Sequence, residues 1–149
     1  MTAVTGNRVQ STRSNLLRNT LRANAAFSII SGVLFIVASN GIAAFLGIKE
    51  ASVFGFLDGP TFILILGIGV LLFGLGVLYD VTRPELRRRD ATLILAGDIA
   101  WVGISALLLL TRALPFSTAG SWAVLITADI VTVFAIGEYI GLRRLRRSH

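Results

Sequence analysis

Three carboxylic acids lie within long apolar stretches of this sequence: Asp98, Asp129 and Glu138. The same stretches contain no lysine, arginine or histidine that could neutralise them. An acid inside a bilayer costs roughly 2.5–3.5 kcal/mol even on the lenient insertion scale, so it normally faces a protein interior or water. Such acids are satisfied by protonation, by hydrogen bonds, by sharing a proton or by binding a cation. We expect at least one of the three to be uncharged near pH 7.

Other polar residues are spaced so that they could join two of these acids. Asn24, Ser28 and Ser31 follow the i, i+4, i+7 spacing that places side chains on one face of a helix. Trp101 follows Asp98 by three residues, and its indole N–H needs an acceptor in an apolar environment.

These observations predict a polar pocket that binds a proton, a cation or a small polar ligand. Its predicted lining is Asn24, Ser28, Ser31, Asp98, Trp101 and Asp129. Glu138 lies about 180° around its helix from Asp129, and we expect it to extend toward nearby arginines instead. The alternative is purely structural: a satisfied hydrogen-bond network that sets the register of the helices.

The elements that must position these residues are four apolar stretches, each long enough to cross a membrane as a helix of about 20 residues. They cover residues 23–46, 60–79, 91–110 and 119–142. The predicted fold class is all-α membrane: a four-transmembrane-helix bundle, up-down-up-down, N-in/C-in. A basic segment, 1–22, precedes the transmembrane domain 23–142, and a basic tail, 143–149, follows it. The first segment is expected to be either an interfacial amphipathic helix or a disordered tail.

The positive charges predict the orientation of the bundle. Twelve of the 14 basic residues precede residue 23, lie between the second and third stretches, or follow residue 142. The other two are Lys49 and Arg112. Because basic residues stay on the cytoplasmic side, both termini are expected in the cytoplasm.

Small residues in the apolar stretches predict sites of close helix packing. The candidates are Gly67, Gly69, Gly74, Gly76, Gly137 and Gly141. They serve either contacts within the bundle, which we favour, or contacts with another subunit.

Composition excludes several functions. The sequence has no cysteine, and its one histidine is the last residue, His149. Disulfide, thiolate, haem and metal-imidazole chemistry therefore lack ligands, and no hydrolase triad can form. The net charge of +6 comes from arginines beside apolar stretches, which favours a lipid bilayer as partner and not nucleic acid. A bound lipid, pigment or quinone stays open, because such sites are mostly apolar.

One resemblance covers nearly the whole chain. The stretch from Leu21 to Gly32, the Asp98-x-x-Trp101 pair and the ending Tyr139-x-Gly141-Leu142-Arg143 resemble a family of small, uncharacterised bacterial four-helix integral membrane proteins. The resemblance implies a location in the bacterial plasma membrane and implies no activity.

Two functions are expected from these patterns. The first is a non-catalytic accessory or structural subunit that packs against other transmembrane helices, or against a second copy as a homo-oligomer. The second is a minimal transporter or ligand-binding protein that uses the intramembrane carboxylates. An enzyme is disfavoured, because no nucleophile or metal ligands accompany the acids.

Overall fold

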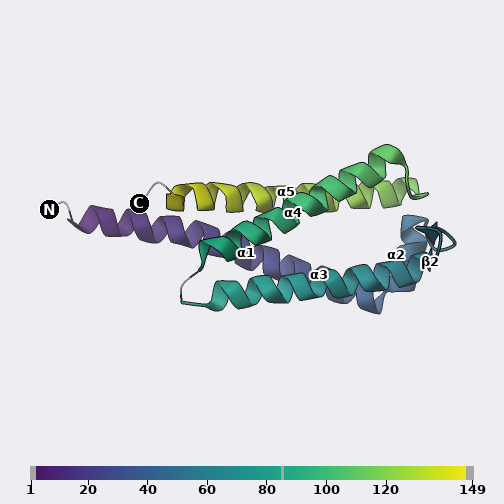
Figure 1. Ribbon diagram of the computed structural model, residues 1–149, viewed down its shortest axis with the longest axis horizontal. Helices are drawn as coiled ribbons and strands as arrows, with labels where there is room; N and C mark the ends of the chain where they lie inside the picture. Colours follow the sequence, from purple (N-terminus) through teal and green to yellow (C-terminus); the bar gives the residue numbers. More distant parts are fainter. Residues whose placement is uncertain (1–2, 85, 147–149) are drawn as a thin grey trace.

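The computed structural model describes residues 3–84 and 86–146, with side chains for 15–84 and 86–144. The long helices are α1 (Ala3–Val37), α3 (Gly59–Thr82), α4 (Arg88–Thr111) and α5 (Thr118–Arg146). A short helix, α2 (Ser39–Leu46), and a two-stranded hairpin of β1 (Ser52–Val53) and β2 (Leu57–Asp58) connect α1 to α3. Consecutive long helices run in opposite directions along one axis (Figure 1). The described part of the chain is therefore a helical bundle with one small hairpin.

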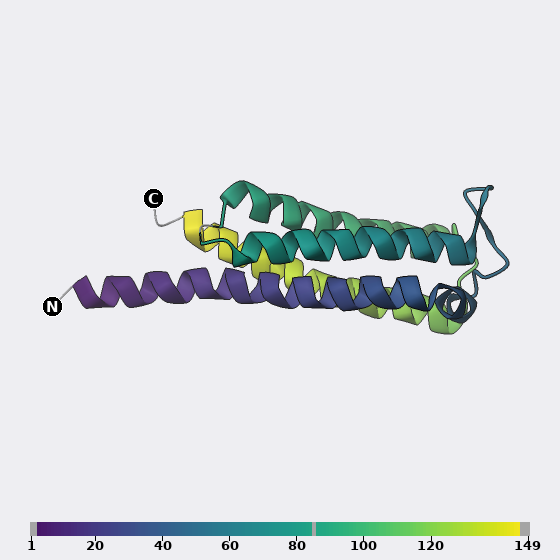
Figure 2. The ribbon, with the colours of Figure 1, turned by 90° about the horizontal axis from the view of Figure 1, so that it is seen from below.

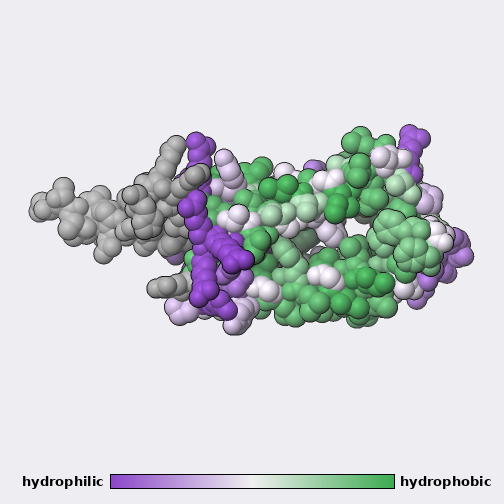
Figure 3. All heavy atoms as spheres, in the orientation of Figure 1, coloured by the Kyte–Doolittle hydropathy of each residue, from purple (hydrophilic) through white to green (hydrophobic). Residues whose placement is uncertain are grey.

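Four helical segments are long and apolar enough to cross a membrane: Asn15–Val37, Gly59–Thr82, Arg88–Thr111 and Thr118–Arg144. Large apolar side chains are exposed along all four, including Leu34, Leu72, Leu107 and Val133. Figure 3 shows an apolar band over the middle of the bundle, with hydrophilic residues gathered at its two ends. This exterior matches an apolar solvent better than water.

The first apolar stretch is not the single helix predicted over residues 23–46. Ala38 leaves the helical conformation, with φ −111° and ψ 24°, so α1 ends at Val37 and α2 begins at Ser39. Figure 2 shows α2 end-on, lying across the long axis of the bundle. Serine, asparagine and glycine at residues 39–41 are weak helix formers, which explains a break at this point.

No break in the helix marks residue 22, where the basic segment is predicted to meet the first span. Helix α1 is continuous through it, and Leu17 and Leu21 are completely buried in the bundle. Arg18 donates hydrogen bonds to the carbonyl oxygens of Arg83, at 2.8 Å, and Pro84, at 2.6 Å. Residues 15–22 therefore hold α1 against the α3–α4 loop and do not form a separate interfacial helix.

Capping residues lie at the starts of α3 and α5, the two long helices that begin near the hairpin. The Asp58 carboxylate accepts the Thr61 backbone N–H at 3.0 Å, which lowers the pKa of Asp58, and Pro60 follows in the first turn of α3. Ser117 Oγ accepts the Gly120 N–H at 2.9 Å and donates to the Phe45 carbonyl at 2.8 Å. The second bond attaches the start of α5 to the end of α2.

The helices pack unevenly around α1. Helix α1 packs against both α3 and α5, and α4 packs against α5. Helices α3 and α4 are consecutive, but their described residues do not pack closely along their lengths. Helix α4 diverges from α3 toward the hairpin (Figure 1). One apolar core, around Leu21 and Val77, lies near the termini, and another, around Ile48 and Ile63, lies under the hairpin. The polar residues and a cavity lie between these two cores.

Candidate functional site

Three buried polar side chains from three helices form one cluster. Asn24 of α1 donates from its amide nitrogen to Asp98 Oδ2 of α4, at 2.6 Å, and to Glu138 Oε1 of α5, at 2.9 Å. Asn24 and Glu138 are completely buried, and Asp98 is 3% exposed. A single amide group thus bridges two carboxyl groups inside the bundle.

Some polar atoms of this cluster have hydrogen-bond partners and one does not. Ser28 Oγ donates to Asn24 Oδ1 at 3.2 Å, so both the nitrogen and the oxygen of the asparagine amide form hydrogen bonds. Glu138 Oε2 is buried and has no hydrogen-bond partner among the described residues. No basic side chain of the described residues hydrogen-bonds to Asn24, Asp98 or Glu138. Neutralisation of the two acids must therefore come from protons or from a bound cation.

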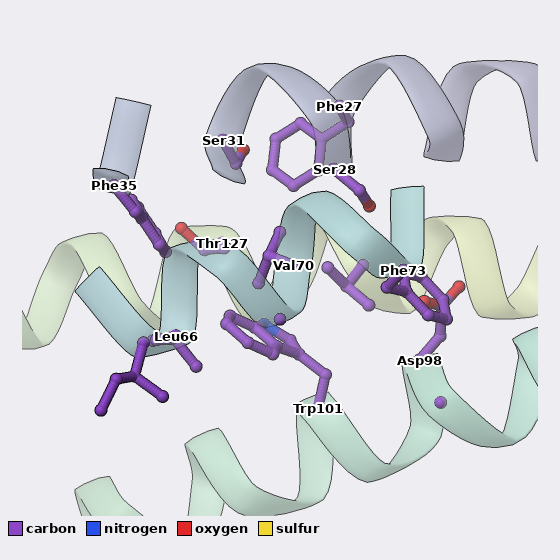
Figure 4. A pocket seen from close by; sticks show the side chains of 14 residues that line it. Phe27, Ser28, Ser31, Phe35, Leu66, Val70, Phe73, Asp98, Trp101 and Thr127 are labelled. Carbon is purple, nitrogen blue, oxygen red and sulfur yellow. The ribbon is translucent and has the colours of Figure 1, made fainter. Parts of the chain in front are cut away.

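A cavity of about 380 Å³ extends from this cluster where α3 and α4 separate, and all four long helices contribute to its lining. Its walls are mainly apolar side chains of Phe27, Phe35, Ile65, Leu66, Val70, Phe73 and Val131. Figure 4 shows Asp98 and Trp101 projecting from α4 into this space, opposite Phe27, Ser28 and Ser31 of α1. Asp98 therefore belongs both to the buried cluster and to the cavity wall.

Trp101 supplies an unused hydrogen-bond donor in the same wall. Its Nε1 is buried and has no acceptor among the described residues. An indole N–H in such a position normally has a partner, because an unmade hydrogen bond in an apolar environment is costly. The cavity thus offers an acidic group at one end, an N–H donor in its wall and apolar surface elsewhere.

The structure brings together only part of the predicted pocket. Asn24, Ser28 and Asp98 share one hydrogen-bond network, and Ser31 and Trp101 line the adjoining cavity. Asp129 does not: it is exposed on the outside of α5, and the prediction that it lines the pocket is wrong.

Glu138 occupies the place predicted for Asp129. The expectation that Glu138 extends toward the arginines is also wrong, because its side chain is completely buried against Asn24. The reason is the rotation of α5, which turns the Glu138 face toward α1 and the opposite face outward. One sequence signal pointed to this rotation: Gly137 and Gly141 flank Glu138, and glycines at this spacing mark a face of close helix contact.

The glycines predicted to pack helices have two different environments. Four of them approach α1: Gly67 faces Phe35, Gly74 faces Ile29, Gly137 faces Thr20 and Gly141 faces Leu17. Gly69 and Gly76 are exposed on α3, and a Cβ added at either would meet nothing within 4 Å.

The cluster does not resemble a metal centre. No group of three or more histidine, cysteine or acidic side chains among the described residues could hold a metal ion. A proton could neutralise an acid at Asp98, and so could an organic cation whose remaining surface suits apolar walls.

Comparisons with protein-family models, with curated proteins and with solved structures find no match for this chain. Arguments about function therefore rest on the site itself.

Proposed function

We propose that this chain is a non-catalytic integral membrane protein that binds an amphipathic ligand, drawn from the bilayer, in the cavity between α3 and α4. The ligand class is a molecule with an apolar body and a cationic or hydrogen-bond-donating end. The observation that carries the proposal is the position of Asp98. Its carboxyl group is bridged to that of Glu138 in a buried cluster without a basic side chain, and Asp98 also lines an apolar cavity.

The proposed pose follows from complementarity. The polar end of the ligand lies against Asp98 and Ser28. A positive charge there would neutralise the buried acids, which have no basic side chain as a partner among the described residues. An acceptor along the body of the ligand reaches the unpartnered Trp101 N–H. The apolar part fills a space large enough for a small organic molecule, since ligand pockets commonly measure about 300–1,000 Å³.

Binding can be measured with Trp101 itself. The only other tryptophan, Trp122, is 60% exposed and does not line this cavity, so Trp122→Phe leaves one reporter in the cavity wall. Bromine-labelled octadecylamine, added to this variant in lipid nanodiscs, is expected to quench Trp101 fluorescence saturably. Quenching by bromine-labelled octadecanol should require about a tenfold higher ligand concentration, because the alcohol lacks the positive charge that pairs with Asp98. The Asp98→Asn substitution should remove the difference between amine and alcohol.

Two glycines of α3 provide a matched control. Gly69→Leu should weaken quenching by both ligands, because Gly69 lines the cavity and a Cβ added there meets no protein atom within 4 Å. Gly76→Leu makes the same change on the same helix, two turns away and outside the cavity, and should leave quenching unchanged. Non-saturable quenching, or equal effects of the two substitutions, would contradict the proposal.

We further propose that the bundle lies in a bacterial plasma membrane with both termini in the cytoplasm. The four apolar helices support membrane insertion, and the twelve arginines that precede the first span, lie between the second and third spans or follow the fourth support this orientation. The family resemblance supports the bacterial membrane. In this proposal, the lipid bilayer surrounds the four apolar helices.

Because the sequence has no cysteine, orientation can be tested with single-cysteine variants. Phe54 in the hairpin and Arg87 in the α3–α4 loop are both exposed. An impermeant maleimide added to intact spheroplasts is expected to label Phe54→Cys. It should label Arg87→Cys only after the membrane is permeabilised. The reverse pattern would show the opposite orientation.

A further inference from the structure

Asp129 is an acid on the outer surface of a membrane-length helix. It is exposed on α5, about 17 Å along the helix from Thr118 and about 23 Å from Arg144, at 1.5 Å per residue. Its neighbours on that surface are apolar: Ile126 is 55% exposed and Val133 is 67% exposed. The acid thus lies in the middle of an apolar face, which we call the Asp129 face.

Nothing in the described part of the bundle satisfies this acid. Its carboxylate has no hydrogen bond or ion pair with any described residue, and it does not line the α3–α4 cavity. Acids within membrane spans normally face the bundle interior, a water-filled space or a partner, because lipid cannot solvate them. A polar or basic group from outside the bundle would therefore stabilise an acid turned outward at this depth.

Charge complementarity identifies the partner. A second copy of this chain is unsuitable, because all described basic residues lie toward the ends of the spans. Those nearest the interior are Arg22, two residues before Asn24, and Arg143, fourteen residues from Asp129 along α5. A helix of another protein can place a lysine or arginine at the required depth, and its apolar residues can cover Ile126 and Val133.

We propose that the Asp129 face of α5 binds a transmembrane helix of another protein that carries a lysine or arginine at mid-depth. This interaction surface lies outside the ligand cavity, so it is independent of the proposed ligand binding. It would make the chain a subunit of a larger membrane assembly.

The test uses synthetic polyleucine helices with one central lysine or, as control, a central leucine. Full-length protein carrying Phe54→Cys with a donor dye, and peptides with an acceptor dye, are mixed in phosphatidylcholine vesicles. The lysine peptide is expected to give energy transfer at about one-tenth the concentration that the leucine peptide needs. Asp129→Asn, which keeps the shape of the side chain, should remove this preference.

Two further variants test the face and not only the charge. Val133→Trp should reduce binding of the lysine peptide by obstructing the turn next to Asp129, whereas Ile104→Trp on an exposed position of α4 should not. Equal binding of both peptides by the wild type, or an unchanged preference in Asp129→Asn, would overturn the proposal. Asp129-dependent energy transfer between labelled copies without peptide would also overturn it, because the partner would then be a second copy.

Discussion

Replacing Asn24 with leucine is expected to lower the free energy of unfolding by about 3–5 kcal/mol, because one amide satisfies two buried acids. Its loss removes two hydrogen bonds to acidic groups and leaves the carboxyl groups of Asp98 and Glu138 facing each other without a donor. Burying unpaired acids is far more costly than burying apolar groups of the same volume. Unfolding followed by circular dichroism in mixed detergent micelles measures the change.

The controls separate this network from ordinary packing. Asn19→Leu makes the same change at an exposed position of α1 and should alter stability by less than about 0.5 kcal/mol. In a background with Asp98→Leu and Glu138→Leu, Asn24→Leu should cost much less than in the wild type, because the acids that need the amide are gone. Equal costs in the two backgrounds would show that Asn24 does not stabilise the fold through the acids.

The second large effect is expected at the contact of α1 with α3. Gly32→Ala should destabilise the bundle by about 1–3 kcal/mol, because the added Cβ would lie 2.6 Å from the backbone nitrogen of Leu71 and 2.8 Å from its Cα. Backbone atoms cannot rotate away as the end of a side chain can, so the two helices must separate. Gly67 faces the same crossing, where an added Cβ would lie 3.0 Å from the Gly32 carbonyl oxygen.

Gly76→Ala is the matched control for this prediction. It makes the same substitution in a membrane-length helix where the added Cβ meets nothing within 4 Å. The better helix propensity of alanine should leave stability unchanged or raise it by up to about 1 kcal/mol. Similar losses for Gly32→Ala and Gly76→Ala in the same unfolding assay would contradict the close approach of α1 and α3.

The helix contacts and the ligand cavity are connected by geometry. Small residues let α1 approach α3 and α5 closely. Helix α4 packs against α5 and separates from α3. The cavity lies where α3 and α4 separate, and Asp98 and Trp101 of α4 form its polar wall. The packing that stabilises the bundle therefore also leaves the space that we propose a ligand fills.

The sequence alone was sufficient for the number of long helices and for several of their ends. Runs of about 20 apolar residues predict membrane-length helices because a helical backbone satisfies its own hydrogen bonds in an apolar solvent. Asp58 and Ser117 mark two helix starts because their side chains accept backbone N–H groups in the first turns of α3 and α5. The break at Ala38 did not show in hydropathy, because Ser39, Asn40 and Gly41 carry no charge and interrupt the apolar stretch over only three residues.

Three of the four residues in the hydrogen-bond network, Asn24, Ser28 and Asp98, were also predicted from the sequence. Asn24 and Ser28 share a helix face, and polar side chains in apolar surroundings need one another. The choice between Asp129 and Glu138 was decided only by tertiary structure. Helix α5 carries Asp129 and Glu138 on opposite faces, so hydropathy does not specify which face turns inward. Contact of Gly137 and Gly141 with α1 sets its rotation, and this rotation buries Glu138 and leaves Asp129 outside.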